Sequence, residues 1–247
     1  MRILLINPNM TEAMTVPMTR VARAVAGQDA EIVPLTATMG FPYIASRAEA
    51  QIAGANVLDM IAENRSEADA VIIAAFGDPG LIAAREVFDL PIIGMAEAAV
   101  LTAAMLGERF SIVTFSPHMA RWYTDCVHQT GLAARFTGVR CPDEAPASVD
   151  NVAEALRGDL IDLTKAATAL DGADVVILGG APLAGLATEL AGKAPGLLID
   201  PIAAATAQAM SLARLAPDYR QRVGRPEAKA SSGLGQALTD IIAGGQA

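Results

Sequence analysis

Three side chains are placed where proton transfer, or hydrogen bonding to a small ligand, can be expected. Asp78 lies in a glycine-rich turn, His118 at the expected start of a helix, and Tyr43 in a loop. A carboxylate can serve as acid, base or acceptor, and a positive helix end favours the neutral histidine that a general base requires. Each also has a structural interpretation: Asp78 as the N-cap of its own helix, His118 packed against Trp122, and Tyr43 as loop packing.

Four expected strand-to-helix turns place small and polar residues at the starts of helices. Free backbone N–H groups and the helix dipole make such ends favourable for carboxylates, imides and other oxygen-rich ligands. One such turn is common, but four in one chain predict a binding site for a small molecule. Glu97 begins a further helix, where it can orient groups in the site or only stabilise the helix dipole. The candidate binding residues are Asn7, Asn9, Phe76, Gly77, Glu97, Thr114, Ser116, Gly180, Ala181 and Pro182.

The two cysteines lack the surroundings of an activated nucleophile. Cys126 lies inside an expected helix and Cys141 in a loop beyond a strand, and neither follows a glycine-rich turn where a helix dipole would lower its pKa. The two cysteines and two histidines also lack metal-ligand spacing, so no metal site is expected. Two cysteines in 247 residues make no disulfide framework, which favours a reducing compartment.

Short buried strands and longer helices are needed to position these residues. Apolar runs at 2–6, 70–75 and 175–178 alternate with helical patterns such as 46–64, 152–170 and 202–215, and Thr11 is expected to cap the first helix. This alternation predicts βαβ units, and therefore parallel sheets with right-handed crossovers. The composition, 53% hydrophobic but only 4% aromatic, suits buried strands covered by alanine-rich helices.

A weak internal repeat indicates how the units are arranged. Residues 68–75 (ADAVIIAA) resemble residues 173–180 (ADVVILGG), and each segment runs into a Gly/Pro turn. Two buried strands can look alike by chance, but duplication would give an α/β protein with two pseudo-symmetric Rossmann-like lobes. Each lobe would have a parallel sheet flanked by helices, and a ligand cleft would lie between them, with Ala75 and Gly180 on opposite sides. The first lobe is predicted to comprise residues 1–96 and 203–247, and the second residues 97–202.

Charge and hydropathy narrow the class of partner. The net charge of −9 disfavours nucleic acid, because an acidic surface repels phosphates. The N-terminal apolar run is shorter than a signal peptide requires, and no uninterrupted apolar run reaches the length of a membrane span. We therefore expect a cytoplasmic protein that binds a small molecule and neither nucleic acid nor a membrane. An apolar patch at 238–242 in the polar tail packs either on the first half or on a partner subunit of a homo-oligomer.

Four segments carry a family resemblance: Ile3–Asn9 (ILLINPN), Phe76–Leu81 (FGDPGL), Pro91–Ala99 (PIIGMAEAA) and Ile177–Ala181 (ILGGA). In this order and spacing they resemble hydantoin racemases, a group that includes allantoin racemase and belongs to the aspartate/glutamate racemase superfamily. The resemblance covers about residues 1–215. It implies two pseudo-symmetric α/β lobes, no cofactor, a small-molecule substrate and usually an oligomer.

The resemblance also implies two catalytic cysteines, one from each lobe, at positions that carry Ala75 and Gly180 here. Inverting a stereocentre takes a base on one face and an acid on the other, and a methyl group and a hydrogen can be neither. Three interpretations follow. The chain is an enzyme that isomerises, decarboxylates or hydrolyses a small ureide, cyclic imide or related carboxylate through Asp78, His118 and Tyr43, without a cofactor. Alternatively, it is a binding protein without turnover, or a racemase whose two cysteines have been replaced.

Overall fold

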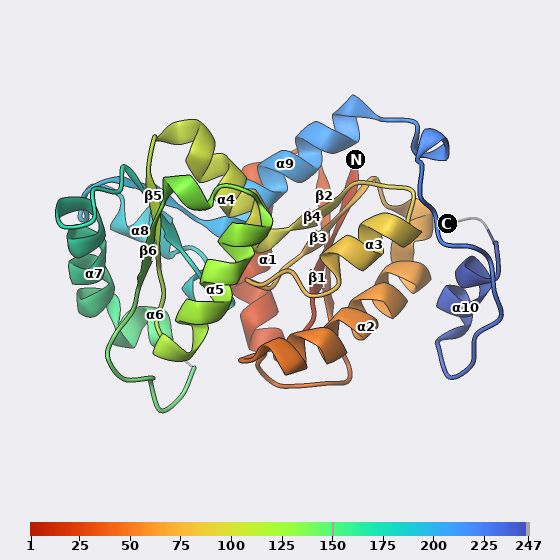
Figure 1. The fold of residues 1–247 in the computed structure, drawn as a ribbon, viewed down its shortest axis with the longest axis horizontal. Helices are drawn as coiled ribbons and strands as arrows, with labels where there is room; N and C mark the ends of the chain where they lie inside the picture. Colours follow the sequence, from red (N-terminus) through yellow and green to blue (C-terminus); the bar gives the residue numbers. More distant parts are fainter. Residues whose placement is uncertain (150, 246–247) are drawn as a thin grey trace.

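Two parallel four-stranded sheets lie side by side in the computed structural model, which describes residues 1–149 and 151–245, with residue 220 described by its backbone alone (Figure 1). The strand orders, β2-β1-β3-β4 and β6-β5-β7-β8, are equivalent, as the internal repeat predicts. We call each sheet with the helices packed on it a lobe. The strands are β1 (Arg2–Asn7), β2 (Glu31–Thr36), β3 (Ala70–Ile73), β4 (Ile92–Gly94), β5 (Phe110–Val113), β6 (Phe136–Arg140), β7 (Val175–Leu178) and β8 (Leu197–Ile199).

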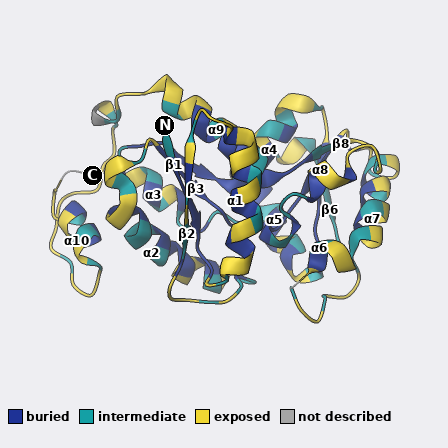
Figure 2. Cartoon of the chain, turned by 180° about the vertical axis from the view of Figure 1, so that it is seen from behind, coloured by how far each residue is buried: buried dark blue, intermediate teal, exposed yellow. Residues whose placement is uncertain are grey.

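The central strands are apolar because both of their faces are covered. Every residue of β3, β5 and β7 is buried, and apart from Ser111 in β5 these strands read as short apolar runs rather than as alternating patterns. Figure 2 shows the buried strands beneath helices whose outer faces are exposed. The α/β class with parallel sheets flanked by helices, expected from the sequence, is confirmed.

The helices follow the expected segments with two local differences. The single helix expected at 152–170 is interrupted at Leu156, whose φ of −102° and ψ of 14° leave the helical region. Thr11 precedes the first helix, but its hydroxyl donates to the Pro42 carbonyl at 2.7 Å instead of capping the helix. No helix among the described residues combines the length and apolarity needed to cross a bilayer. The helices are α1 (Glu12–Ala26), α2 (Arg47–Asn64), α3 (Leu81–Val87), α4 (Met95–Leu106), α5 (Pro117–Gln129), α6 (Val152–Ala155), α7 (Arg157–Ala169), α8 (Leu186–Leu190), α9 (Pro201–Leu215) and α10 (Gln236–Ile242).

Two helices cross between the lobes and hold them together. The helix α4 follows a strand of the first sheet but packs on β7 and β8, whereas α9 follows the second sheet and packs on α1, β3 and β4. The two helices also contact each other, and Figure 1 shows α9 bridging the top of the molecule. Gln208 on α9 donates to the Ala98 carbonyl at 2.9 Å and to Thr102 Oγ1 at 3.0 Å. The lobes therefore share one continuous packed connection.

The C-terminal segment packs on the first lobe. Leu238 and Ile241 of α10 are buried in the same apolar cluster as Val57 and Ile61 of α2. Of the two expected positions for this apolar patch, the structure shows the intramolecular one. Residues 246 and 247, the end of the predicted first lobe, lie outside the described residues.

Candidate active site

A small cavity lies where the two lobes face each other. Its volume is about 20 Å³, which is enough for about one water molecule. Ala75, after β3, and Ala181, next to Gly180 after β7, line this same cavity from opposite lobes. The lining residues are Asn9, Tyr43, Ile44, Ala75 and Phe76 from the first lobe, and Trp122, Tyr123 and Ala181 from the second.

Asn7 and Asn9 form a buried hydrogen-bonded turn at the end of β1. Asn7 Nδ2 donates to Asn9 Oδ1 at 3.0 Å and to Thr15 Oγ1 at 2.9 Å. Asn9 Oδ1 also accepts from the backbone N–H of Thr11 at 2.9 Å. Only Asn9 reaches the cavity wall, while Asn7 lies behind it. Of these two predicted binding residues, Asn9 is therefore placed to touch a ligand, and Asn7 is placed to fix the orientation of Asn9.

The carboxylate of Asp78 fixes the turn that follows β3. Its two oxygens accept from the backbone N–H groups of Ala96 and Glu97, both at 2.8 Å, at the start of α4. Gly94, the N-cap of α4, has no side chain, and a Cβ there would lie 2.4 Å from Asp78 Cγ. Asp78 thus occupies the space of a capping side chain and caps α4. The structural interpretation that it caps its own helix, α3, is wrong, because the preceding glycine turn directs the carboxylate toward α4.

The surroundings of Asp78 place its titration close to neutrality. Burial raises the pKa of Asp78 to about 7, although the hydrogen bonds from the two backbone N–H groups lower it. The nearby carboxylate of Glu97 raises the pKa further, and the Arg85 guanidinium lowers it. Glu97 itself is paired with Arg85 through both carboxylate oxygens, one of them 3.0 Å from Nη1. Glu97 is therefore engaged in an ion pair with α3 and is not part of the cavity wall.

The second lobe has an equivalent connection between a loop and a helix, but here the carboxylate belongs to the helix cap and reaches the loop. Asp200, the N-cap of α9, accepts from the backbone N–H of Ile202 at 2.9 Å, and also from Gly185 at 2.6 Å, in the loop that follows β7. In each lobe a carboxylate therefore ties the loop after the third strand to the helix after the fourth. The sequence alone did not single out Asp200, although an aspartate directly before a proline-initiated helix is a recognisable cap signal.

Two aromatic residues of α5 complete the cavity wall. The ring of Tyr123 packs against Phe76 of the first lobe, with 4.5 Å between ring centroids. Its phenol lies beside that of Tyr43, and Trp122 closes the adjoining side. Burial raises the pKa of both phenols well above the usual value of a tyrosine. Both hydroxyls therefore remain protonated donors at neutral pH.

The sequence analysis did not identify Trp122 and Tyr123 as residues of the cavity wall. They lie on the same buried face of α5 as Met119 and Cys126. A signal existed, since this helix begins directly after one of the four polar turns. That turn is tied to the turn that follows β7, because Thr114 Oγ1 donates to the Gly179 carbonyl at 2.9 Å.

The backbone at Gly180 leaves no room for a side chain. Its φ of +124° is a backbone conformation that residues other than glycine rarely adopt. A Cβ there would lie 2.8 Å from Phe115 Cε1 and 3.5 Å from the Tyr123 hydroxyl. The space beside Gly180 is therefore bordered by the ring of Phe115, from the turn after β5, and by the phenol of Tyr123, from α5.

The other predicted residues lie around the cavity. Gly77 lines an outer groove of about 480 Å³ together with Trp122, so Trp122 separates this groove from the cavity. Ser116 caps α5 by accepting from the backbone N–H of His118 at 3.4 Å. The side chain of His118 is exposed and is not among the lining residues. Pro182 lines a different groove, of about 690 Å³, beside α1.

Neither cysteine lines the cavity. Burial, with the negative charges of Asp78 and Asp125, raises the pKa of Cys126 to about 12, and burial also raises that of Cys141. These shifts oppose thiolate formation, in agreement with the expectation that neither thiol is activated. Within residues 1–149 and 151–245, no group of three or more His, Cys, Asp or Glu side chains is placed to hold a metal ion.

Comparison with known proteins identifies the family. Residues 3–209 match the family described as Asp/Glu/Hydantoin racemase. A hydantoin racemase from Paenarthrobacter aurescens is 32% identical over 217 residues, which cover 87% of this chain and 92% of that protein. Another, from Pseudomonas sp. strain NS671, is 36% identical over 191 residues, 77% of each chain. The solved structure of allantoin racemase from Klebsiella pneumoniae has a TM-score of 0.89 and 34% identity, covering 96% of this chain and 98% of that one. The chain therefore belongs to the Asp/Glu/hydantoin racemase family, in the group of the hydantoin and allantoin racemases.

Proposed function

We propose that this protein is a cofactor-independent enzyme of the hydantoin racemase type that acts on a small ureide, cyclic imide or related carboxylate. The cavity between the lobes carries this proposal, because both lobes contribute side chains to its wall. Family membership supports a small-molecule substrate. Since the cavity has a volume of only about 20 Å³, a five-membered ring enters only when the lobes separate or the wall moves.

The chemistry proposed for this cavity does not use thiols. Among the described residues that line it, none carries a charge. The side chains with hydrogen-bonding groups are the amide of Asn9, the phenols of Tyr43 and Tyr123, and the indole of Trp122. Such groups donate hydrogen bonds and stabilise an oxyanion or enolate oxygen. Of the three catalytic candidates, Tyr43 is the one that touches a ligand in this proposal. Asp78 holds the turn beside Ala75, and His118 lies outside the wall.

A second candidate function is ligand binding without turnover. One observation favours it: the described lining residues include no side chain that acts as a base near neutral pH. Abstraction of a proton from carbon requires such a base, so the uncharged wall suits binding as well as it suits catalysis. The two candidates differ in what becomes of a bound ligand.

Thermal-shift and fluorescence measurements on the same samples separate the two functions. The panel comprises hydantoin, allantoin, succinimide and phenylmalonate, and each binder is then followed by chiral chromatography and mass analysis. Trp122 is the one tryptophan of the chain and lines the cavity, so its fluorescence reports occupancy. At a ligand concentration of about 100 Kd we expect stabilisation of about 2.7 kcal/mol, which raises Tm by roughly 5–10 °C.

The fate of a binder decides the outcome. A binder that changes chirality or mass supports the enzyme. A binder that stabilises the fold and quenches Trp122 but is recovered unchanged supports the binding protein instead. Failure of all four compounds to stabilise the protein would contradict both the cavity site and the proposed substrate class.

A further inference from the structure

The hydroxyl of Tyr123 lies where a side chain of the second lobe would otherwise project. Gly179 and Gly180 follow β7 and present no side chain to the cavity. The Tyr123 hydroxyl is 3.5 Å from the position that a Cβ of residue 180 would take. The phenol of Tyr123, from α5, therefore borders a space to which the Gly179–Gly180 turn contributes no functional group.

The two phenols are held in place by aromatic packing from both lobes. The ring of Tyr123 lies 4.5 Å from that of Phe76 and 6.1 Å from that of Trp122, centroid to centroid. The ring of Tyr43 lies 6.2 Å from that of Phe115. Tyr123 is only 2% exposed, so its hydroxyl has few alternative positions. Donors fixed in this way lose little entropy when a ligand arrives.

We propose that the hydroxyl groups of Tyr123 and Tyr43 form a hydrogen-bond-donating subsite that receives a carbonyl or oxyanion oxygen of the ligand beside Gly180. This subsite rests on the proposed function, because it assigns a binding role within the same cavity. An oxygen acceptor is the fitting ligand group because the described lining residues include no carboxylate to balance a cation. Burial raises the pKa of both phenols, so they remain donors over the neutral pH range.

The substitution Tyr123→Phe tests the subsite by removing one oxygen and keeping the ring. The Kd of hydantoin and of succinimide is measured by titrating Trp122 fluorescence. We expect affinity for both probes to fall by about 10- to 100-fold, as when a buried donor to a ligand oxygen is lost. Tyr43→Phe is expected to weaken binding in the same direction.

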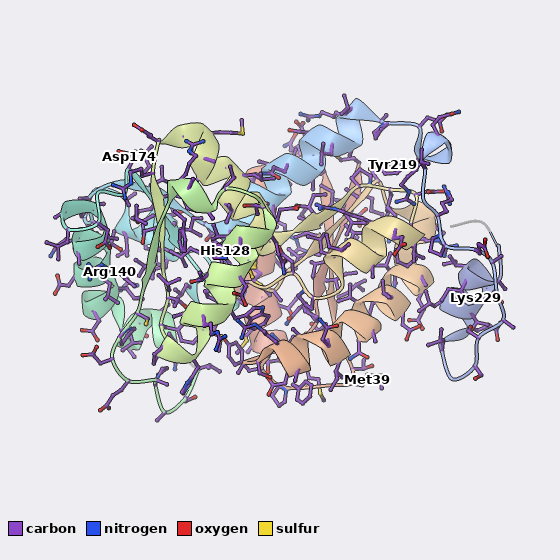
Figure 3. All side chains as sticks on the ribbon, in the orientation of Figure 1. Met39, His128, Arg140, Asp174, Tyr219 and Lys229 are labelled. Carbon is purple, nitrogen blue, oxygen red and sulfur yellow. The ribbon has the colours of Figure 1, made fainter. Side chains whose placement is uncertain are left out.

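Tyr219→Phe is the matched control. Tyr219 is the third tyrosine of the chain and lies beside the C-terminal segment, away from α5 (Figure 3). Its phenol is not among the groups that line the cavity, so this variant is expected to bind both probes as the wild type does. Thermal unfolding of all variants shows whether the fold is retained.

Binding and turnover are scored separately, so that the subsite and the proposed function can fail independently. Wild-type affinity in a folded Tyr123→Phe variant would overturn the subsite even if the protein turns a substrate over. Weakened binding in that variant, with no turnover by the wild type, would support the subsite and contradict the enzyme. Failure of the wild type to bind either probe would overturn the subsite.

Discussion

Replacing Gly180 with cysteine is expected to destabilise the fold by about 3 kcal/mol rather than to create a working thiol. The φ of +124° strains any residue other than glycine, and a Cβ would lie 2.8 Å from Phe115 Cε1. For a chain of 247 residues this loss lowers Tm by roughly 6–12 °C, which thermal unfolding measures directly. The variant is also expected to lack hydantoin racemase activity.

Gly138→Cys is the matched control for this prediction. Gly138 has a φ of +129°, close to that of Gly180, but nothing lies within 4 Å of the position of its Cβ. It therefore reports the backbone strain alone, and the difference between the two variants measures the contact with Phe115. Equal losses in the two variants would show that Phe115 moves aside freely.

The double variant Ala75→Cys with Gly180→Cys tests whether the chain is a racemase whose cysteines have been replaced. Ala75 is not among the residues with positive φ and lines the cavity, so cysteine is expected to be accepted there. If the two positions had held thiols in this same backbone, the double variant would fold with wild-type stability and racemise hydantoins. That result would contradict our expectation and favour replaced cysteines over chemistry without thiols.

Asp78 is expected to make the protein less stable as pH rises from 4 to 7, by up to about 4 kcal/mol. Its folded pKa of about 7 lies above the usual aspartate pKa of 3.8. Between these values the folded protein binds more protons than the unfolded chain, so the free energy of unfolding falls with increasing pH. The contribution of this group is full below about pH 4 and is lost as pH rises through 7. Urea unfolding at a series of pH values measures the slope, and Asp78→Asn is expected to remove this part of it.

Asp174→Asn is the control for Asp78→Asn. Exposed Asp174 also accepts from two backbone N–H groups, those of Glu108 and Arg109, both at 2.9 Å, and it lies at the outer edge of the second lobe (Figure 3). Its substitution alters two similar hydrogen bonds without removing a buried carboxyl group. A pH slope in Asp78→Asn equal to that of the wild type would show that Asp78 does not titrate near neutrality.

The sequence by itself determined the α/β class and the positions of most elements. Buried strands such as β3 and β7 need continuous apolar runs, and the turns that end them need Gly, Pro and Asn, so both leave local patterns. The repeat between residues 68–75 and 173–180 predicted two equivalent sheets for the same reason. These features depend on neighbours in the chain, and a single sequence is sufficient to show them.

Only the tertiary structure decided which way the polar side chains point. The sequence placed Asp78 correctly in a turn, but its carboxylate reaches α4 because Gly94, sixteen residues later, leaves the space free. It placed His118 correctly at the start of α5, but the rotation of that helix exposes the histidine and turns Tyr123 toward the first lobe. Helical periodicity identifies a buried face without showing whether that face meets its own sheet or a neighbouring lobe. Contacts between residues far apart in the chain settle that choice, and they settle which groups share the cavity.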